Sequence, residues 1–198
     1  VNVTGAGGSA IAGDISFTAI PLMFNRFRDV MAPKAWLYIC GGQSNMLLYS
    51  KLIEEYCRQL PRIIVWDKGR TAVMRHNGYH SCFEFIYYTF MEGGGGTWYG
   101  ERDSDSADDI WRVRTPNEAN GRMHVTEKPV LLPERAIQNS SRHGDIVWEP
   151  FSGSGSTLIA CENLGRRCRA VEIAPGYVAV ALERWATHTG KTPVLLNE

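Results

Sequence analysis

Several familiar sequence signals are absent from this chain of 198 residues. Its five cysteines are an odd number without a Cys-x-x-Cys pair, which argues against a disulfide framework and a metal site. No apolar run approaches the roughly 20 residues that a membrane-spanning helix needs, and no secretory signal pattern is recognisable. These absences predict reduced, buried thiols in a cytoplasmic protein that has no membrane partner.

An excess of charge of either sign is also absent. The formal net charge is zero, from 21 basic and 21 acidic residues. A neutral chain has no overall attraction for nucleic acid, so any such contact must come from local clusters such as Arg166, Arg167 and Arg169. Such a cluster is more often a solvated strand entrance than a DNA site.

The hydrophobic pattern predicts one α/β domain. A hydrophobic content of 44% in a chain of this length can bury one substantial core. Helices are expected at 20–31, 46–60, 129–140, 156–164 and 176–188. Strands are expected at 35–40, 62–66, 83–90, 145–148 and 168–173, and the segment 91–123 is expected to be a loop. This alternation indicates a mostly parallel sheet with helices on both faces.

A glycine-rich loop joins the expected strand at 145–148 to the helix at 156–164. Its sequence at 149–157 is Glu-Pro-Phe-Ser-Gly-Ser-Gly-Ser-Thr. Gly153 and Gly155 allow a tight turn and a close approach to a ligand, and the helix start at Ser156 presents free N–H groups. Glu172 follows at the end of the next strand, where an acid can accept both hydroxyls of an adenosine ribose. Two glycines can also form a plain strand-to-helix turn, and the flanking elements and Glu172 argue against that simpler interpretation.

The residues that this loop lacks reduce the number of candidate adenosine cofactors. A phosphate-binding P-loop needs a lysine after its second glycine, and here Ser156 and Thr157 follow Gly155 directly, which argues against ATP. A dinucleotide loop has a third glycine where this chain has Leu158, which argues against NAD. The loop suits S-adenosyl-L-methionine, which carries no phosphate.

Several segments together resemble the amino-DNA methyltransferases that modify adenine N6 or cytosine N4. The resemblance covers nearly the whole chain from about residue 20, and rests on 64–68 (Ile-Val-Trp-Asp-Lys), 79–85 (Tyr-His-Ser-Cys-Phe-Glu-Phe), 124–129 (His-Val-Thr-Glu-Lys-Pro), 149–157, 165–167 (Gly-Arg-Arg) and 171–177 (Val-Glu-Ile-Ala-Pro-Gly-Tyr). The position of the glycine loop late in the chain is similar to the permuted β group, in which the catalytic half comes first. The resemblance implies a circularly permuted, Rossmann-like methyltransferase fold. It also implies that the protein works in the cytoplasm of a bacterial or phage-infected cell.

The resemblance implies a role for each part of the chain. Residues 1–19 would be a mobile loop, 20–90 the rest of the catalytic half, 91–123 a loop or target-recognition insert, and 124–198 the cofactor half of a single domain. The implied cofactor-binding residues are Glu149, Phe151, Gly153, Gly155, Ser156, Thr157, Glu172, Thr126 and Lys128. Among these, Lys128 could equally be an exposed charge at a helix start, and Glu149 stands where the family more often has aspartate.

The implied reaction is direct methyl transfer to an exocyclic amine of a base flipped out of double-stranded DNA. Adenine N6 is the amine we favour, on the resemblance alone. Asp67, Lys68 and His80 are candidates for the DNA side, although Asp67 and Lys68 are more typical of a solvated turn. His80 could equally be a strand-entry histidine paired with Glu84.

The family's catalytic signature, Asp-Pro-Pro-Tyr or a close variant, does not occur in these 198 residues. We expect it upstream of Val1, in a strand followed by the mobile loop, so the catalytic residues stay unassigned. Two other classes stay open: a cofactor-binding module without activity, and a methyltransferase acting on a small molecule or a protein. A sheet without its catalytic strand would leave an open edge, which favours a homodimer.

Overall fold

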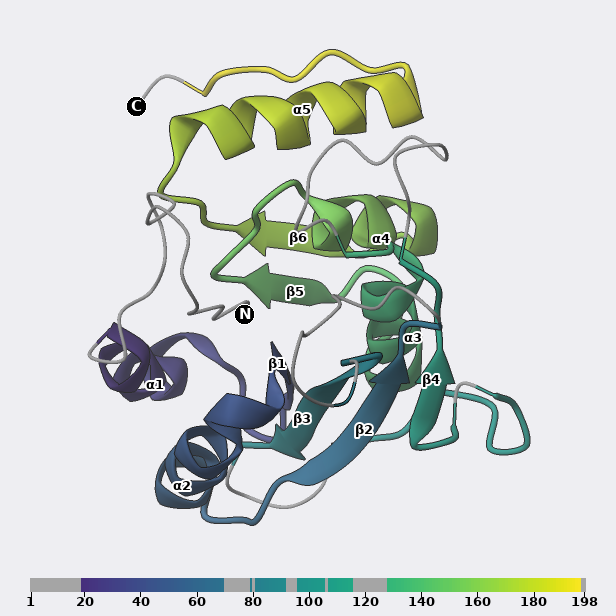
Figure 1. Cartoon of the computed structure of the whole chain (residues 1–198). Coiled ribbons are helices and arrows are strands. Elements are labelled where there is room, and N and C mark those ends of the chain that lie inside the picture. Colours follow the sequence, from purple (N-terminus) through teal and green to yellow (C-terminus); the bar gives the residue numbers. More distant parts are fainter. Residues whose placement is uncertain are drawn as a thin grey trace. The chain divides into compact units, whose positions relative to one another are not determined.

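The computed structural model describes residues 19–69, 79, 81–91, 96–105, 107–115 and 128–196 (Figure 1). Of the segment 1–19, expected to be a mobile loop, residues 1–18 lie outside these residues, and Ala19 is instead the first residue of a helix. The chain forms two compact units. The first unit is Val1–Thr115 with Asn139–Ser141, and the second unit is Pro116–Gln138 with Arg142–Glu198.

The first unit contains a four-stranded mixed sheet in the order β1-β3-β2-β4. These strands are β1 (Trp36–Gly41), β2 (Arg62–Asp67), β3 (Phe83–Phe90) and β4 (Ile110–Arg112). β3 runs antiparallel to both β1 and β2, whereas β4 runs parallel to β2. The sequence predicted mostly parallel pairing. Parallel neighbouring strands need a crossover connection, usually a helix, and the sequence indicates no helix between β2 and β3. The antiparallel pairing of β2 and β3 follows from that missing crossover helix.

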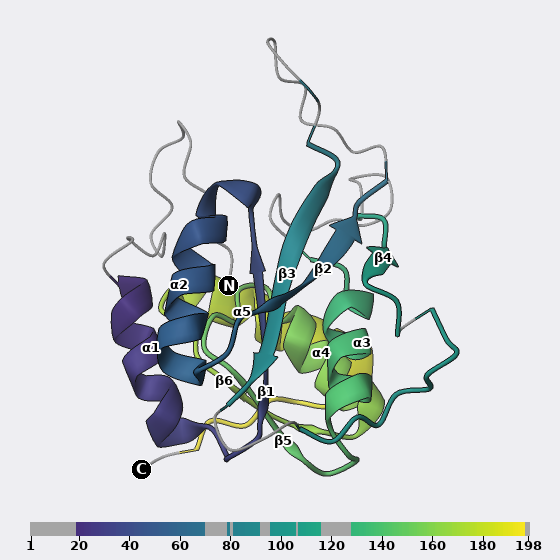
Figure 2. The same cartoon turned by 90° about the horizontal axis from the view of Figure 1, so that it is seen from below.

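Two helices of the first unit lie side by side, α1 (Ala19–Val30) and α2 (Met46–Cys57), as both views show (Figure 2). The rings of Phe24 on α1 and Tyr56 on α2 are 5.8 Å apart. α2 packs on the sheet through Tyr49, whose ring centroid is 5.3 Å from that of Tyr87 on β3. A short 3-10 helix, η1 (Gln43–Asn45), leads into α2.

Aromatic side chains line part of the first unit's sheet. Tyr38 on β1 and Tyr88 on β3 are cross-strand partners with stacked rings 5.9 Å apart. Trp36 stacks on both, and Trp98 meets Trp36 edge-on at 6.3 Å. The Tyr38 hydroxyl also lies 2.5 Å from the hydroxyl of Ser140.

The second unit is built on a parallel pair of strands, β5 (Ile146–Glu149) and β6 (Arg167–Ala170). α4 (Ser156–Leu164) connects them, and α5 (Pro175–Thr189) follows β6. α3 (Leu131–Ser140) precedes β5, and all of it but the last two residues belongs to this unit. A small core joins α3, α4 and the strands, and consists of Ile137, Ala160 and Cys161, with Val130, Val147, Leu164 and Cys168 packed against it.

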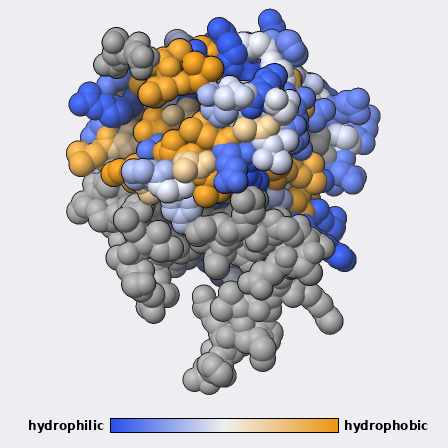
Figure 3. Space-filling model, turned by 90° about the horizontal axis from the view of Figure 1, so that it is seen from above, coloured by the Kyte–Doolittle hydropathy of each residue, from blue (hydrophilic) through white to orange (hydrophobic). Residues whose placement is uncertain are grey.

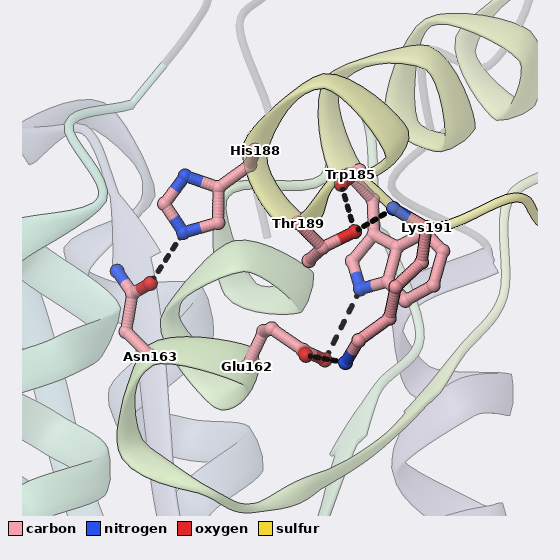
Figure 4. Close-up of polar contacts among 6 residues, drawn as sticks. All are labelled: Glu162, Asn163, Trp185, His188, Thr189 and Lys191. Carbon is pink, nitrogen blue, oxygen red and sulfur yellow. Dashed lines mark hydrogen bonds and ion pairs between the residues drawn. The ribbon is translucent and has the colours of Figure 1, made fainter.

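A network of polar contacts ties the end of α5 to α4 (Figure 4). The Glu162 carboxylate accepts hydrogen bonds from Lys191 Nζ at 2.6 Å and from Trp185 Nε1 at 3.2 Å. His188 Nε2 lies 2.6 Å from Asn163 Oδ1, again joining the two helices. We call these five residues the α4–α5 clasp.

Apolar side chains are also exposed on α5 and the segment after it, on the face seen from above (Figure 3). Leu182 is 42% exposed, and Val194, Leu195 and Leu196 are 79% to 87% exposed. Within the part of the chain that the structure describes, no helix is long and apolar enough to span a membrane.

The predicted helices and strands are all present, several with shifted ends, whereas β4 lies within the segment 91–123 that was expected to be a loop. α2 ends at Cys57, three residues before the predicted end, because Arg58 has a left-handed backbone with φ of 58°. β6 ends at Ala170, so Glu172 lies in the turn after the strand instead of within it. Of the five cysteines, only Cys57 and Cys161 are buried, and Cys82 is exposed, which corrects the expectation that all are buried.

Candidate functional site

The glycine-rich loop joins β5 to α4 as the sequence predicted. Gly153 and Gly155 have left-handed backbones, with φ of 52° and 84°. Gly155 is also needed for space, because a Cβ atom there would lie 2.8 Å from Cβ of Ala181 on α5. A Cβ atom at Gly153 would instead meet nothing within 4 Å, so the backbone at Gly153 faces open space. The loop is therefore packed at its second glycine and open at its first.

Glu172 is bonded directly to this loop. Its Oε2 accepts a hydrogen bond from Gly153 N–H at 2.8 Å, and its Oε1 accepts one from Ala174 N–H at 2.9 Å. The Ser152 N–H donates to Val171 O at 3.0 Å and joins the same two segments. Each carboxylate oxygen has a second lone-pair direction, so Glu172 can still accept further hydrogen bonds.

Glu149 is a second carboxylate at the loop. Its Oε1 accepts a hydrogen bond from Phe151 N–H at 3.0 Å, and its Oε2 accepts one from the Thr157 hydroxyl at 2.8 Å. The Glu149 side chain thus spans the loop from its first residues to the first turn of α4. Glu149 and Glu172 both stabilise the loop through backbone N–H groups, and both are partly buried.

The first turn of α4 presents backbone N–H groups that a ligand could bind. Among the described residues, the backbone N–H groups of Ser156, Thr157 and Leu158 have no backbone acceptor, and no side chain caps the helix. The Ser156 hydroxyl donates to the carbonyl of Lys128 at 2.7 Å, so the chain before α3 lies beside this helix start. The partial positive charge of a helix N-terminus favours an anionic group here.

The structure thus brings together seven of the nine predicted cofactor residues: Glu149, Phe151, Gly153, Gly155, Ser156, Thr157 and Glu172. Lys128 contacts these seven residues through its backbone carbonyl, which accepts the hydrogen bond from the Ser156 hydroxyl. Thr126 lies outside the described residues.

The residues predicted for the DNA side belong to the first unit. Asp67 accepts a hydrogen bond from Gly69 N–H at 2.8 Å. Lys68 forms an ion pair with Glu84, and its Nζ lies 4.9 Å from the ring centre of Trp66. Both side chains therefore have partners within the first unit. Asp67 bonds to the backbone two residues further along, and Lys68 pairs with a residue of β3. His80 lies outside the described residues.

One feature of the first unit was not predicted from the sequence. A hollow of about 30 Å³ is lined by Tyr38, Ile64, Tyr88, Trp98, Ala107, Asp108, Asp109, Trp111 and Asn139. That volume holds one or two waters and is far smaller than a nucleobase. The hollow is a packing feature of the aromatic side chains described above.

Sequence reasoning also missed Arg184, on α5. Its Nη1 donates to the carbonyl of Ser154 at 2.6 Å and to the Ser154 hydroxyl at 3.0 Å. No local signal marks such a residue, because it lies 30 positions from its partner.

Comparison with known proteins defines the class. A family model described as DNA methylase, of the N6/N4 methyltransferase type, matches residues 20–183. The chain therefore belongs to the N6/N4 DNA methylase family.

Two curated relatives match different lengths of the chain. Type II methyltransferase M2.DpnII of Streptococcus pneumoniae is 25% identical over 167 residues, which are 79% of this chain and 62% of that protein. Type II methyltransferase M.HpaI of Haemophilus parainfluenzae is 43% identical over 65 residues, which are 33% of this chain and 21% of that protein. The chain spans less than two thirds of the length of either relative.

Solved structures confirm the predicted methyltransferase fold. The structure of an M1.HpyAVI–SAM complex matches with a TM-score of 0.72 at 22% identity, over 85% of this chain and 82% of that one. The PvuII DNA methyltransferase, described as cytosine-N4-specific, matches with a TM-score of 0.68 at 16% identity, over 93% of this chain and 78% of that one. This chain therefore has the Rossmann-like α/β fold of the S-adenosylmethionine-dependent methyltransferases.

Proposed function

We propose that this protein binds S-adenosyl-L-methionine at the loop 149–157, as the cofactor-binding part of a DNA methyltransferase. The observation that carries the proposal is the hydrogen bond that Gly153 N–H donates to Glu172, which places a carboxylate beside a glycine that faces open space. Family membership and the SAM complex of M1.HpyAVI support the choice of cofactor. The loop has no lysine for a phosphate group, which also agrees with this cofactor.

The residues present fit the parts of this cofactor. Glu172 would accept the ribose hydroxyls, because its oxygens keep lone pairs after bonding to the loop. The open N–H groups at the start of α4 would bind the methionine carboxylate, together with Lys128 and Thr126. Glu149 would attract the methionine ammonium, and Phe151 would contact the apolar part of the ligand. The cofactor supplies an electrophilic methyl group on its sulfonium.

The proposed substrate is an exocyclic amine of a base flipped out of double-stranded DNA, and adenine N6 is the amine we infer. Membership of a DNA methylase family supports DNA as the partner. Asp67, Lys68 and His80 would lie on the DNA side, with Lys68 held by Glu84. Transfer to an amine needs no protein nucleophile, so these residues would orient the base and exclude water.

We also infer a homodimer in the cytoplasm of a bacterial or phage-infected cell. β1 and β5 each end their sheet and have one strand partner among the described residues. An open strand edge favours pairing with another chain. Light scattering across a range of concentrations measures the association, and a constant monomer mass would contradict it.

The cofactor proposal is tested by calorimetric titration of the protein with S-adenosylhomocysteine and with its 2′-deoxy analogue. Glu172→Gln is expected to weaken binding of the ribose ligand about tenfold or more, since a hydrogen bond to a charged group contributes roughly 1.5 to 3 kcal/mol. The matched control is Glu183→Gln, which changes an exposed acid of α5 and should leave the affinity within about twofold.

The two ligands separate ribose binding from support of the loop. If Glu172 contacts the ribose, its replacement should cost the 2′-deoxy analogue clearly less affinity than the ribose ligand. An equal loss for both ligands would limit Glu172 to supporting the loop. No binding by the unaltered protein would contradict the proposed cofactor.

A further inference from the structure

α5 lies directly against the glycine-rich loop within the second unit. Besides the 2.8 Å approach to Cβ of Ala181, a Cβ atom at Gly155 would lie 3.2 Å from the Ala181 Cα atom. The loop backbone therefore rests on the surface of the helix, and a larger side chain at either position would separate them.

Arg184 lies one helical turn beyond Ala181 and bonds to the same loop. A single nitrogen, Nη1, donates to both the carbonyl and the hydroxyl oxygen of Ser154. Ser154 is only 9% exposed, so both bonds are largely shielded from water. Hydrogen bonds from a charged donor are stronger than neutral ones, and shielding preserves that strength.

The peptide group between Ser154 and Gly155 is held from both sides. A trans peptide is planar and directs its carbonyl and its N–H to opposite sides. The carbonyl of Ser154 points to Arg184, while the N–H of Gly155 donates to Ser152 O at 3.0 Å. Rotation of this peptide would break bonds on both sides. The peptide immediately precedes the open N–H groups of Ser156 and Thr157, so its orientation fixes where those donors point.

We propose that Arg184 is a positioning residue that holds the loop in its ligand-binding shape before the cofactor arrives. Preorganisation of this kind raises affinity because the ligand does not have to order the loop. Arg184 lies one residue beyond the segment 20–183 that matches the family model. This role rests on the cofactor site proposed above.

Calorimetric titration with S-adenosylhomocysteine compares the unaltered protein with Arg184→Met and Arg184→Lys. Arg184→Met removes both bonds to Ser154 and is expected to raise the dissociation constant about tenfold. Arg184→Lys keeps the charge, so its dissociation constant should lie between those of the unaltered protein and Arg184→Met. The matched control is Lys191→Met, which removes a cation just after the same helix. This cation bonds to Glu162 and not to the loop. Lys191→Met should change the affinity less than about twofold.

Hydrogen exchange gives a readout that needs no ligand. The Gly155 amide is expected to exchange about tenfold faster in Arg184→Met than in the unaltered protein, and not in Lys191→Met. Equal affinity and equal exchange in Arg184→Met would overturn the proposal. A general loss of stability is a different outcome, because it would speed exchange throughout α4 and α5 as well as in the loop, and it would also overturn the proposal.

The two tests distinguish the two hypotheses. If the unaltered protein binds the ligand and only the Arg184 variants lose affinity, both the cofactor site and the role of Arg184 are supported. If the unaltered protein does not bind, the cofactor site fails and the proposed role fails with it, whatever the exchange rates show.

Discussion

Two tyrosine hydroxyls are buried in the first unit without a hydrogen-bond partner among the described residues. They belong to Tyr49 on α2 and Tyr87 on β3, whose rings pack against each other. Burying an unpaired hydroxyl costs free energy, since it loses its hydrogen bonds to water. Both side chains therefore contribute to stability through their rings and not through their hydroxyl groups.

Tyr87→Phe is expected to stabilise the protein by about 1 kcal/mol, since it removes the unpaired hydroxyl and keeps the ring. Tyr38→Phe is the matched control, because its hydroxyl lies 2.5 Å from that of Ser140 and the substitution removes that bond. It should destabilise the protein by a similar amount. Urea denaturation measures both, and a Tyr87→Phe protein less stable than the unaltered one would show that its hydroxyl has a partner.

The same tyrosine predicts a loss of stability at alkaline pH. Burial raises the pKa of Tyr87 from 10.0 to about 12. A raised pKa in the folded state means that its contribution is complete below pH 10 and is lost as the pH rises towards 12. Tyr87→Phe should reduce this alkaline loss, which denaturation at pH 9 and at pH 11 would measure.

At the scale of single residues, the sequence predicts which side chains meet in the site when they belong to neighbouring segments of the chain. Gly153, Gly155 and Glu172 could be grouped because a strand–loop–helix unit sets their separation, and the bond from Gly153 to Glu172 agrees with that grouping. Arg184 could not be found this way, because its contact depends on how α5 packs on the loop. The unpaired hydroxyl of Tyr87 depends in the same way on packing between α2 and β3.

Among the elements, α5 and Lys191 just after it contact α4 at both of its ends. Arg184 and Ala181 contact the loop before α4, while the clasp joins the C-terminal parts of the two helices. The clasp is centred on the carboxylate of Glu162. The hydrogen bond from Lys191, and then that from Trp185, lower the pKa of Glu162 below its usual value of 4.5.

The clasp is expected to weaken in acid. A carboxyl group with a lowered pKa in the folded state contributes stability above pH 4.5 and loses it as the pH falls through the folded value. Glu162→Gln should therefore reduce the fall in melting temperature between pH 6 and pH 3. Glu183→Gln, which changes an exposed acid on α5, should leave that fall unchanged. An equal acid loss in Glu162→Gln would show that other carboxylates dominate.

Except for β4, the order and type of the elements follow from the sequence, because periodicity and turn residues act locally. α4 has the predicted bounds at both ends, since Gly155 and Gly165 both take left-handed backbones beside it. The direction of β3 was not predicted, because strand pairing depends on contacts distant in sequence. β6 ended early for a similar reason: the chain turns after Ala170, where Ser152 and Gly153 bond to Val171 and Glu172.

At the scale of the whole molecule, the chain carries the proposed cofactor site but not the family's catalytic tetrapeptide. The predicted cofactor residues meet in the second unit, whereas Asp-Pro-Pro-Tyr occurs nowhere in the 198 residues. In the proposed reaction, the acid and the proline carbonyl of that segment would accept hydrogen bonds from the amine. Without these acceptors, a bound methyl donor would face a base that is not held for attack.

We therefore expect the 198-residue chain to bind S-adenosyl-L-methionine and to leave duplex DNA unmethylated. The measurement is incubation with a labelled methyl donor and duplex DNA, followed by analysis of the nucleosides. Glu172→Gln provides the background, since it should neither bind well nor transfer. Transfer above this background would show that residues within the chain replace the tetrapeptide, and the product would identify the amine. N6-methyladenine would support the inferred base, whereas N4-methylcytosine would contradict it.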